Sequence, residues 1–237
     1  MDPATDAAVN LPGLLGFAAL LMGFGALIWF FVVKPDRAEA AGLAALAART
    51  DWRVERHTPH GGRGYHVDIR PVSGDWRCRV TRYRNGSTTV LTTELDCPSP
   101  RLGDGMIVVG PGLSQADLGA AAAALTGHGL LETVLPMLLG DRAAARGLAP
   151  VDLDLPGAST FATPGLDAQA VVEAWAPHLA AWRAARGADD RFPILVLGTD
   201  GLRLRVRRDL GDPDELGAFV ELGLAARGAV RTALDVG

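Results

Sequence analysis

Cysteine and lysine are scarce in this 237-residue chain, which has two cysteines, Cys78 and Cys97, and one lysine, Lys34. Two cysteines are too few for a scaffold built on disulfides, and a cytoplasmic domain would keep them reduced. We therefore expect two free thiols. All other basic residues are arginines, and the formal net charge is −4. This balance gives no global attraction to nucleic acid, so we expect no nucleic-acid partner.

Motifs that identify a reaction or a cofactor are also missing. The glycine-rich segment 61–64 comes before a predicted strand, whereas phosphate-binding loops follow a strand and open a helix. No serine or cysteine is placed beside His66 and Asp68 to serve as a nucleophile. We therefore expect no cofactor, and a non-enzymatic protein more than an enzyme.

A long apolar segment, by contrast, is present near the N-terminus. Residues 11–33 contain no charged side chain. As a helix, they would span about 34 Å, enough to cross a hydrocarbon core of roughly 30 Å. A cleaved signal peptide is the alternative, because Ala38-Glu39-Ala40 fits a cleavage pattern. The apolar run is too long for a signal peptide and no basic residue precedes it, so a transmembrane helix is the better prediction.

Basic residues set the expected orientation of this helix. None lies in residues 1–10, whereas Lys34, Arg37 and Arg49 follow the span. The positive-inside rule then places residues 1–10 outside the cell and the main domain in the cytoplasm. We predict a single-pass protein of the bacterial inner membrane, with a juxtamembrane helix over residues 34–50 and a soluble domain over residues 51–237.

Small residues recur on one face of the predicted span. Gly16, Ala19, Gly23 and Ala26 are spaced by three and four, and small residues let two membrane helices approach closely. Self-association or contact with another membrane protein is therefore expected. The alternative is ordinary glycine and alanine usage in a chain rich in both.

Two turns predict an antiparallel meander at the start of the soluble domain. The Asn85-Gly86 pair favours a two-residue hairpin, in which Val80 faces Leu91 and Arg77 faces Glu94. The same register places Trp76 opposite Leu95.

A turn at Ser73-Gly74 adds a preceding strand, with Val67 opposite Val80 and Asp68 opposite Arg79. The resulting three-stranded sheet has one apolar and one ionic face.

The rest of the domain is predicted to alternate helices and strands. The expected elements are a strand over 106–109, helices near 114–125 and 130–139, an irregular stretch over 147–164 with an extended piece at 151–155, a helix starting at Thr163-Pro164 and bent or divided at Pro177, a hairpin over 193–208 around Asp200-Gly201, and a helix starting at Asp212. This order indicates an α+β fold with antiparallel sheet.

The C-terminal half shows a family resemblance. Its layout rests on Phe161, on Leu179 and Trp182, on Ile194-Leu195-Val196, on Gly201-Leu202-Arg203-Leu204, and on Asp212-Pro213 with Leu216. It resembles the C-terminal half of uncharacterised single-pass membrane proteins of GC-rich bacteria. The resemblance supports the general architecture and implies no activity.

Arginines on the predicted strands are the best candidates for a functional surface. They are Arg77, Arg79, Arg203, Arg205 and Arg207. If the two strand sets join, these side chains form a basic face that suits an acidic protein patch or anionic lipid headgroups. The alternative is a solvated face of cross-strand ion pairs.

Three histidines are weak candidates for a metal site. His57, His60 and His66 lie within ten residues, with Asp68 beyond, and these ligand types suit zinc. Their spacing matches no standard motif, and a solvated loop is the alternative.

These features together predict a membrane-anchored, non-enzymatic interaction or assembly module for a protein partner at the membrane or a second copy. A domain that binds anionic lipid or a phosphate ligand is the alternative, and a metal-dependent enzyme is less expected.

Overall fold

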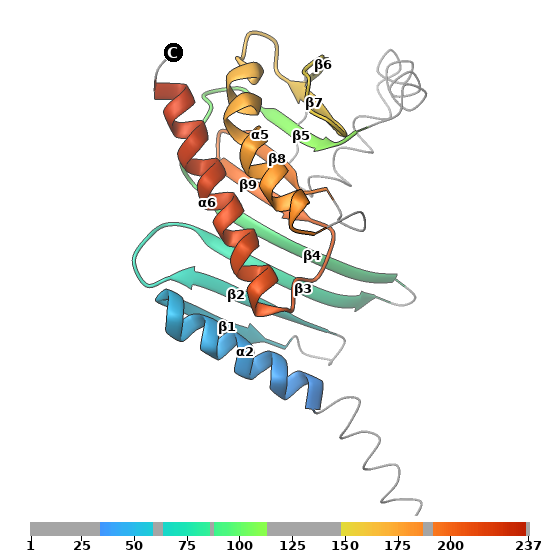
Figure 1. The fold of residues 1–237 in the computed structure, drawn as a ribbon, viewed down its shortest axis with the longest axis vertical. Coiled ribbons are helices and arrows are strands. Elements are labelled where there is room, and N and C mark those ends of the chain that lie inside the picture. The colour runs from blue at the N-terminus through green and yellow to red at the C-terminus, as the bar shows by residue number, and fades with distance from the viewer. Residues whose placement is uncertain (1–33, 59–63, 86–87, 113–147, 187–191, 236–237) are drawn as a thin grey trace, which may run out of the picture. The chain divides into compact units, whose positions relative to one another are not determined.

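The structure is a computed structural model that describes residues 34–58, 64–85, 88–112, 148–186 and 192–235 (Figure 1). The chain divides into two compact units, Met1–Ala45 and Leu46–Gly237. The boundary falls inside the helix α2 (Lys34–Thr50), and the second unit contains every other described element.

The described strands of the second unit form one nine-stranded sheet in the order β1-β2-β3-β4-β9-β8-β5-β7-β6. The strands are β1 (Trp52–His57), β2 (Gly64–Pro71), β3 (Arg77–Asn85), β4 (Thr88–Cys97), β5 (Ile107–Pro111), β6 (Ala149–Val151), β7 (Ala158–Ala162), β8 (Ile194–Gly198) and β9 (Gly201–Val206). Every neighbouring pair runs antiparallel. The predicted α+β class with an antiparallel sheet is confirmed.

The N-terminal meander and the C-terminal hairpin are parts of the same sheet. Strand β4 pairs with β9, so that Leu95 faces Leu204 and Glu94 faces Arg205. In each strand alternate residues point to the same side, so apolar and charged side chains fall on opposite faces. The N-terminal meander and the C-terminal hairpin therefore join, which was the condition for a shared arginine face.

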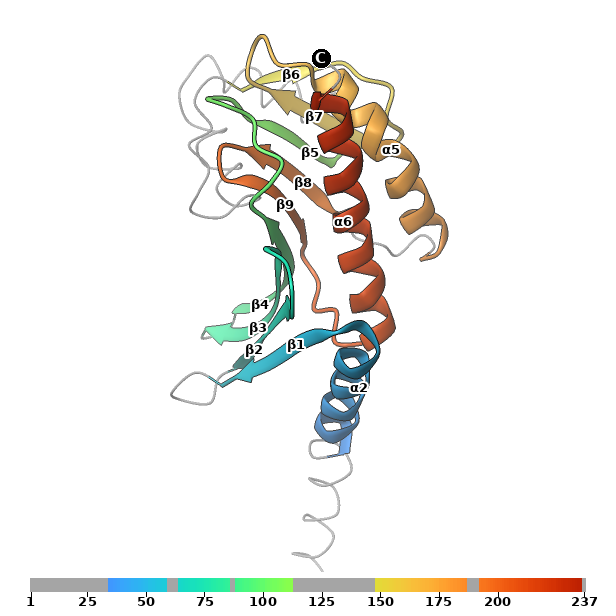
Figure 2. The same cartoon turned by 90° about the vertical axis from the view of Figure 1, so that its left-hand side faces the viewer.

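Two long helices cover the apolar face. They are α5 (Ala168–Ala184) and α6 (Pro213–Asp235), and both lie on the same side of the sheet (Figure 2). Asp212 caps α6, since its Oδ1 atom accepts hydrogen bonds from the backbone N–H groups of Asp214 and Glu215, each at 3.0 Å. This start was predicted from the sequence, and Leu216 and Phe219 of α6 are buried.

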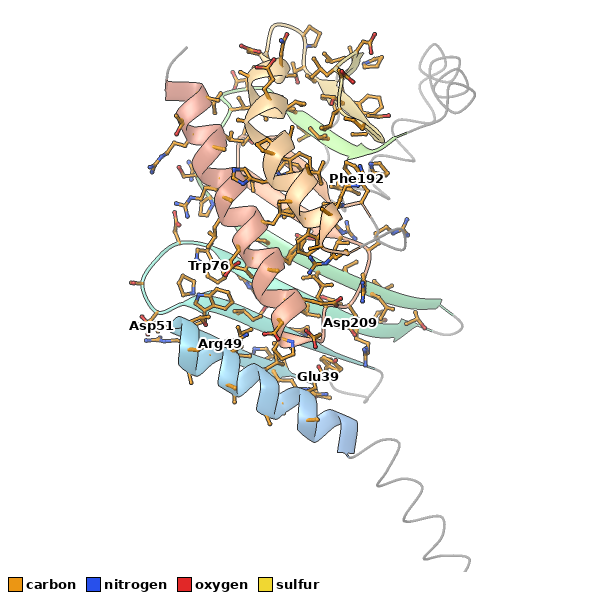
Figure 3. The ribbon with its side chains drawn as sticks, viewed as in Figure 1. Glu39, Arg49, Asp51, Trp76, Phe192 and Asp209 are labelled. Atoms are coloured by element: carbon orange, nitrogen blue, oxygen red, sulfur yellow. The ribbon has the colours of Figure 1, made fainter. Side chains whose placement is uncertain are left out.

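Glycine lets α6 approach the sheet. A Cβ atom on Gly223 would lie 2.0 Å from Cδ2 of Leu95, which is fully buried. Aromatic rings fill the space between the helices and around them. Trp182 of α5 meets Phe219 of α6 edge-on at 5.7 Å between ring centroids, and Phe192 lies 6.4 Å from Trp175 (Figure 3). The core is therefore an apolar layer between the sheet and the two helices.

The last turn of α2 belongs to this second unit. Leu46 is buried, and a Cβ atom on Gly217 would lie 3.6 Å from its Cδ1 atom. Arg49 forms an ion pair with Asp214 in the first turn of α6 (Figure 3). These contacts tie residues 46–50 to the start of α6.

The predicted β3–β4 register is wrong by two residues. Val80 faces Thr93 instead of Leu91, and Arg77 faces Asp96 instead of Glu94. Leu95 faces Cys78, not Trp76 as predicted. The β2–β3 register, including Val67 opposite Val80 and Asp68 opposite Arg79, is as predicted. A shift of two leaves each side chain on its own face, so the division into an apolar and an ionic face is unaffected.

The C-terminal half needs three corrections. The stretch predicted as irregular contains β6 and β7. The helix α5 begins at Ala168, not at Thr163-Pro164, because Asp167 accepts a hydrogen bond from the backbone N–H of Ala170 at 3.0 Å. Pro177 lies inside one continuous helix. The division of the helix predicted there does not occur, and Pro177 itself is exposed.

No helix among the described residues is both long and apolar enough to cross a bilayer. The predicted span 11–33, with Gly16, Ala19, Gly23 and Ala26, falls outside the described residues, as do the predicted helices 114–125 and 130–139. The membrane anchor therefore stays a prediction.

Candidate functional site

The side of the sheet away from α5 and α6 carries rows of charged residues on four neighbouring strands. We call this surface the charged face. It consists of Asp68, Arg77, Arg79, Glu94, Asp96, Arg203 and Arg205. It includes four of the five arginines expected to bind a partner, and it adds three carboxylates between them.

Asp68 of β2 is the most buried group of the charged face. Its side chain is 6% exposed and accepts four hydrogen bonds from two guanidinium groups. Arg77 donates to it from Nε and Nη2 at 3.2 and 2.6 Å, and Arg79 from the same atoms at 2.8 and 3.2 Å. Because the two arginines are two residues apart on β3, they point to the same side and clamp one carboxylate.

A second cluster follows on β4 and β9. Nε of Arg203 lies 2.6 Å from Oδ1 of Asp96 and 2.9 Å from Oε1 of Glu94. Nε of Arg205 lies 3.9 Å from Oε2 of Glu94. Both arginine side chains are only 16% exposed. The strands thus alternate in sign, from acidic β2 to basic β3, acidic β4 and basic β9.

The four arginines that lie on strands form cross-strand ion pairs, which was the alternative interpretation of these residues. Among these seven residues four positive charges stand beside three negative ones, so the paired groups are close to neutral, and the exposed Arg70 of β2 adds one positive charge on the same side. The fifth residue, Arg207, is exposed one position beyond the end of β9.

An exposed apolar pair extends the same face toward the tip of the β3–β4 hairpin. Tyr83 and Val90 face each other across the two strands and are 40% and 37% exposed. Because Arg79 and Tyr83 are four residues apart on β3, their side chains point to the same side. Sequence reasoning missed this pair, because the predicted register did not place the two residues opposite each other.

Two of the three candidate histidines lie side by side. His57 of β1 and His66 of β2 face each other, with ring centroids 4.9 Å apart and planes 24° from parallel. Ligand atoms of these two imidazoles and of Asp68 all lie within 4.8 Å of one another. His60 falls outside the described residues.

A cavity of about 280 Å³ opens at the other end of the charged face, beside the β8–β9 turn. Its charged lining residues include Arg77, Asp96 and Arg203, which are already paired within the charged face. Asp75 also lines it and bonds Arg227 of α6 at 2.7 Å. Local sequence patterns do not predict this cavity, because it forms where β4 meets a hairpin a hundred residues away.

The two cysteines are free and buried, as predicted. Burial raises the pKa of the Cys78 thiol far above its ordinary value, and it raises the pKa of Cys97 to about 12. Neither sulfur is a thiolate near neutral pH, so neither offers a nucleophile.

Comparison with known proteins identifies no relative. No protein-family model matches the chain, and no curated protein or solved structure is detectably similar to it.

Proposed function

We propose that this chain is a membrane-anchored, non-enzymatic interaction or assembly module whose cytoplasmic α+β domain binds a protein partner at the membrane. The observation that carries the proposal is the charged face with the exposed Tyr83–Val90 pair beside it. Apolar groups next to charges of both signs suit a protein surface, and tyrosine is enriched at protein interfaces. The apolar run of residues 11–33 supports the anchor.

The anionic-lipid alternative gains little from the geometry. A lipid headgroup would have to compete with carboxylates that already bond Arg77, Arg79 and Arg203. The electrostatic attraction of a polybasic surface depends on unmatched positive charge. A protein partner needs no such excess, because complementary charges of both signs determine which partner fits.

Site-specific photo-crosslinking in native membranes tests the proposal. A photoreactive side chain at Val90 points to the charged face, whereas one at Thr89 points to the opposite side of the same strand. Both positions are exposed, so the pair is closely matched. We expect a discrete adduct from position 90 and at least a fivefold weaker one from position 89.

The mass of the adduct identifies the class of partner. A heavier species that contains a second protein, or an adduct of twice the chain's mass, supports the interaction module. A chain that crosslinks equally from both positions, or that yields only lipid adducts from position 90, would overturn the proposed docking face.

A further inference from the structure

We infer that His57, His66 and Asp68 form a binding site for one divalent transition-metal ion of the zinc class. The inference rests on the cross-strand register, which brings two imidazoles and a carboxylate together at the β1 end of the charged face. It does not depend on the protein partner proposed above.

The distances are close to those of a zinc site. With Zn–N bonds of about 2.0–2.1 Å, the ligand atoms of a tetrahedral ion lie roughly 3.3 Å apart. The ligand atoms of the three side chains lie within 4.8 Å of one another, so small side-chain rotations bring them into range. The two rings are nearly parallel and 4.9 Å apart, and strands β1 and β2 hold their backbones in register.

The role of Asp68 follows from the bonds that it already makes. Each of its oxygens accepts two hydrogen bonds from Arg77 and Arg79, which leaves little capacity for direct coordination. Oδ2 lies 3.8 Å from Nε2 of His57. This distance is longer than a hydrogen bond, and a small rotation of the ring would bring Oδ2 to the place of a carboxylate that orients a ligating imidazole. We therefore assign His57 and His66 as ligands and Asp68 as the positioning residue.

Carboxylates and arginines both surround the histidine pair. Glu55 places Oε2 3.6 Å from Nε2 of His57, and Asp68 adds a second negative charge. Four arginines are also close: Arg77 and Arg79 bond Asp68, and Arg53 and Arg70 line the hollow beside Glu55 and Asp68. The imidazole nitrogens therefore hold the ion, without a local excess of negative charge. The His57 side chain is 47% exposed, so an ion reaches the site from solvent, and water completes its coordination.

Metal titration of the full-length protein in detergent tests the inference. After treatment with a chelator, the protein is titrated with Zn²⁺ by calorimetry and with Co²⁺, whose visible absorption reports tetrahedral nitrogen and oxygen ligands. We expect one ion per chain at this site. His57→Gln and His66→Gln should each weaken binding at least tenfold and remove the tetrahedral Co²⁺ spectrum.

Two further variants separate a site from nonspecific binding. His178→Gln, on α5, should bind the ion as the unsubstituted protein does. Asp68→Asn should weaken binding about tenfold to a hundredfold, as loss of a carboxylate behind a ligating histidine does. His57 is exposed, so folding tolerates its replacement. If His57→Gln changes the metal affinity less than threefold, the assignment is overturned. It is also overturned if His178→Gln weakens binding as much as His57→Gln does.

Discussion

The two faces of strands β2, β3, β4 and β9 share one backbone and differ in what holds them. On the helix-covered face, Val80, Leu95 and Leu204 are at most 1% exposed, and the last two pack against Gly223 of α6. On the charged face, the alternate residues Arg79, Glu94 and Arg205 are 44%, 27% and 16% exposed. Arg79 forms an ion pair with Asp68, and Arg205 forms one with Glu94. The alternation of apolar and charged residues along these strands thus produces one layer held by apolar packing and one layer held by ion pairs.

The two layers contribute unequally to stability. Full burial of a large apolar side chain contributes about 1.5–3 kcal/mol, whereas an ion pair open to solvent contributes about 0–1 kcal/mol. The free energy of unfolding therefore resides mainly on the helix-covered face. Apart from the buried Asp68, the charged face can change with little cost to folding, which leaves it available for recognition.

Phe219→Ala should give the largest effect on the helix-covered face. The ring is fully buried against Trp182, and its removal leaves a cavity that the rigid sheet cannot fill. We expect a loss of about 3–5 kcal/mol in the free energy of unfolding. Denaturant unfolding of the full-length protein measures it, and Glu221→Ala, at an exposed position of α6, is the control. A loss below 1 kcal/mol would mean that α6 is not part of the core.

Gly201→Ala is an exception to the rule that substitutions on the charged face cost little stability. Gly201 lies at the start of β9, on the same side as Arg203, and is buried. Its φ angle is +109°, and a Cβ atom would lie 2.2 Å from the backbone oxygen of Cys97. We expect a loss of about 2–3 kcal/mol, since both the backbone angle and the β4–β9 pairing are strained. Gly103→Ala, which meets nothing within 4 Å, should be nearly neutral in the same unfolding measurement.

Asp68→Asn tests whether the buried carboxylate of the charged face stabilises the fold. The amide keeps the shape of the carboxylate but accepts fewer hydrogen bonds from Arg77 and Arg79 and removes a charge that is 6% exposed. We expect a loss of about 2 kcal/mol, less than for a fully buried pair because the arginines reach solvent. Asp104→Asn, at an exposed position, is the control. If the two variants lose equal stability, Asp68 contributes no more to folding than an exposed carboxylate does.

Alternation and turn residues predict much of this architecture. The β2–β3 register, the α6 cap at Asp212 and the division of β3 into Cys78 and Val80 on one side and Arg77 and Arg79 on the other all follow from local sequence. Of the candidate sites, the pairing of Asp68 with Arg79 also follows from the predicted β2–β3 register, whereas the proximity of His57 to His66 depends on β1, whose pairing was not predicted.

Long-range contacts account for what the sequence did not predict. Thr93 is fully buried opposite Val80, where its hydroxyl donates to the Arg208 carbonyl oxygen at 2.9 Å and accepts from the Leu210 N–H at 3.2 Å. These bonds tie β4 to the segment after β9, so they favour the observed β3–β4 register over the one that the Asn85-Gly86 turn suggests. Local pattern carries no information about such a distant partner.

Arg227→Gln should give the smallest effect and completes the comparison. Nη1 of Arg227 on α6 lies 2.7 Å from Oδ1 of Asp75, which is 49% exposed in the turn between β2 and β3. We expect a loss of about 0.5 kcal/mol, because water competes for the carboxylate. This loss should shrink toward zero in 1 M salt, where the screening length is about 3 Å. The loss caused by Asp68→Asn should persist in the same salt, since its carboxylate is shielded from ions. If both losses vanished in salt, the burial of Asp68 would not make its ion pairs more stabilising than the exposed Arg227–Asp75 pair. The charged face would then be uniformly solvated from β2 to β9.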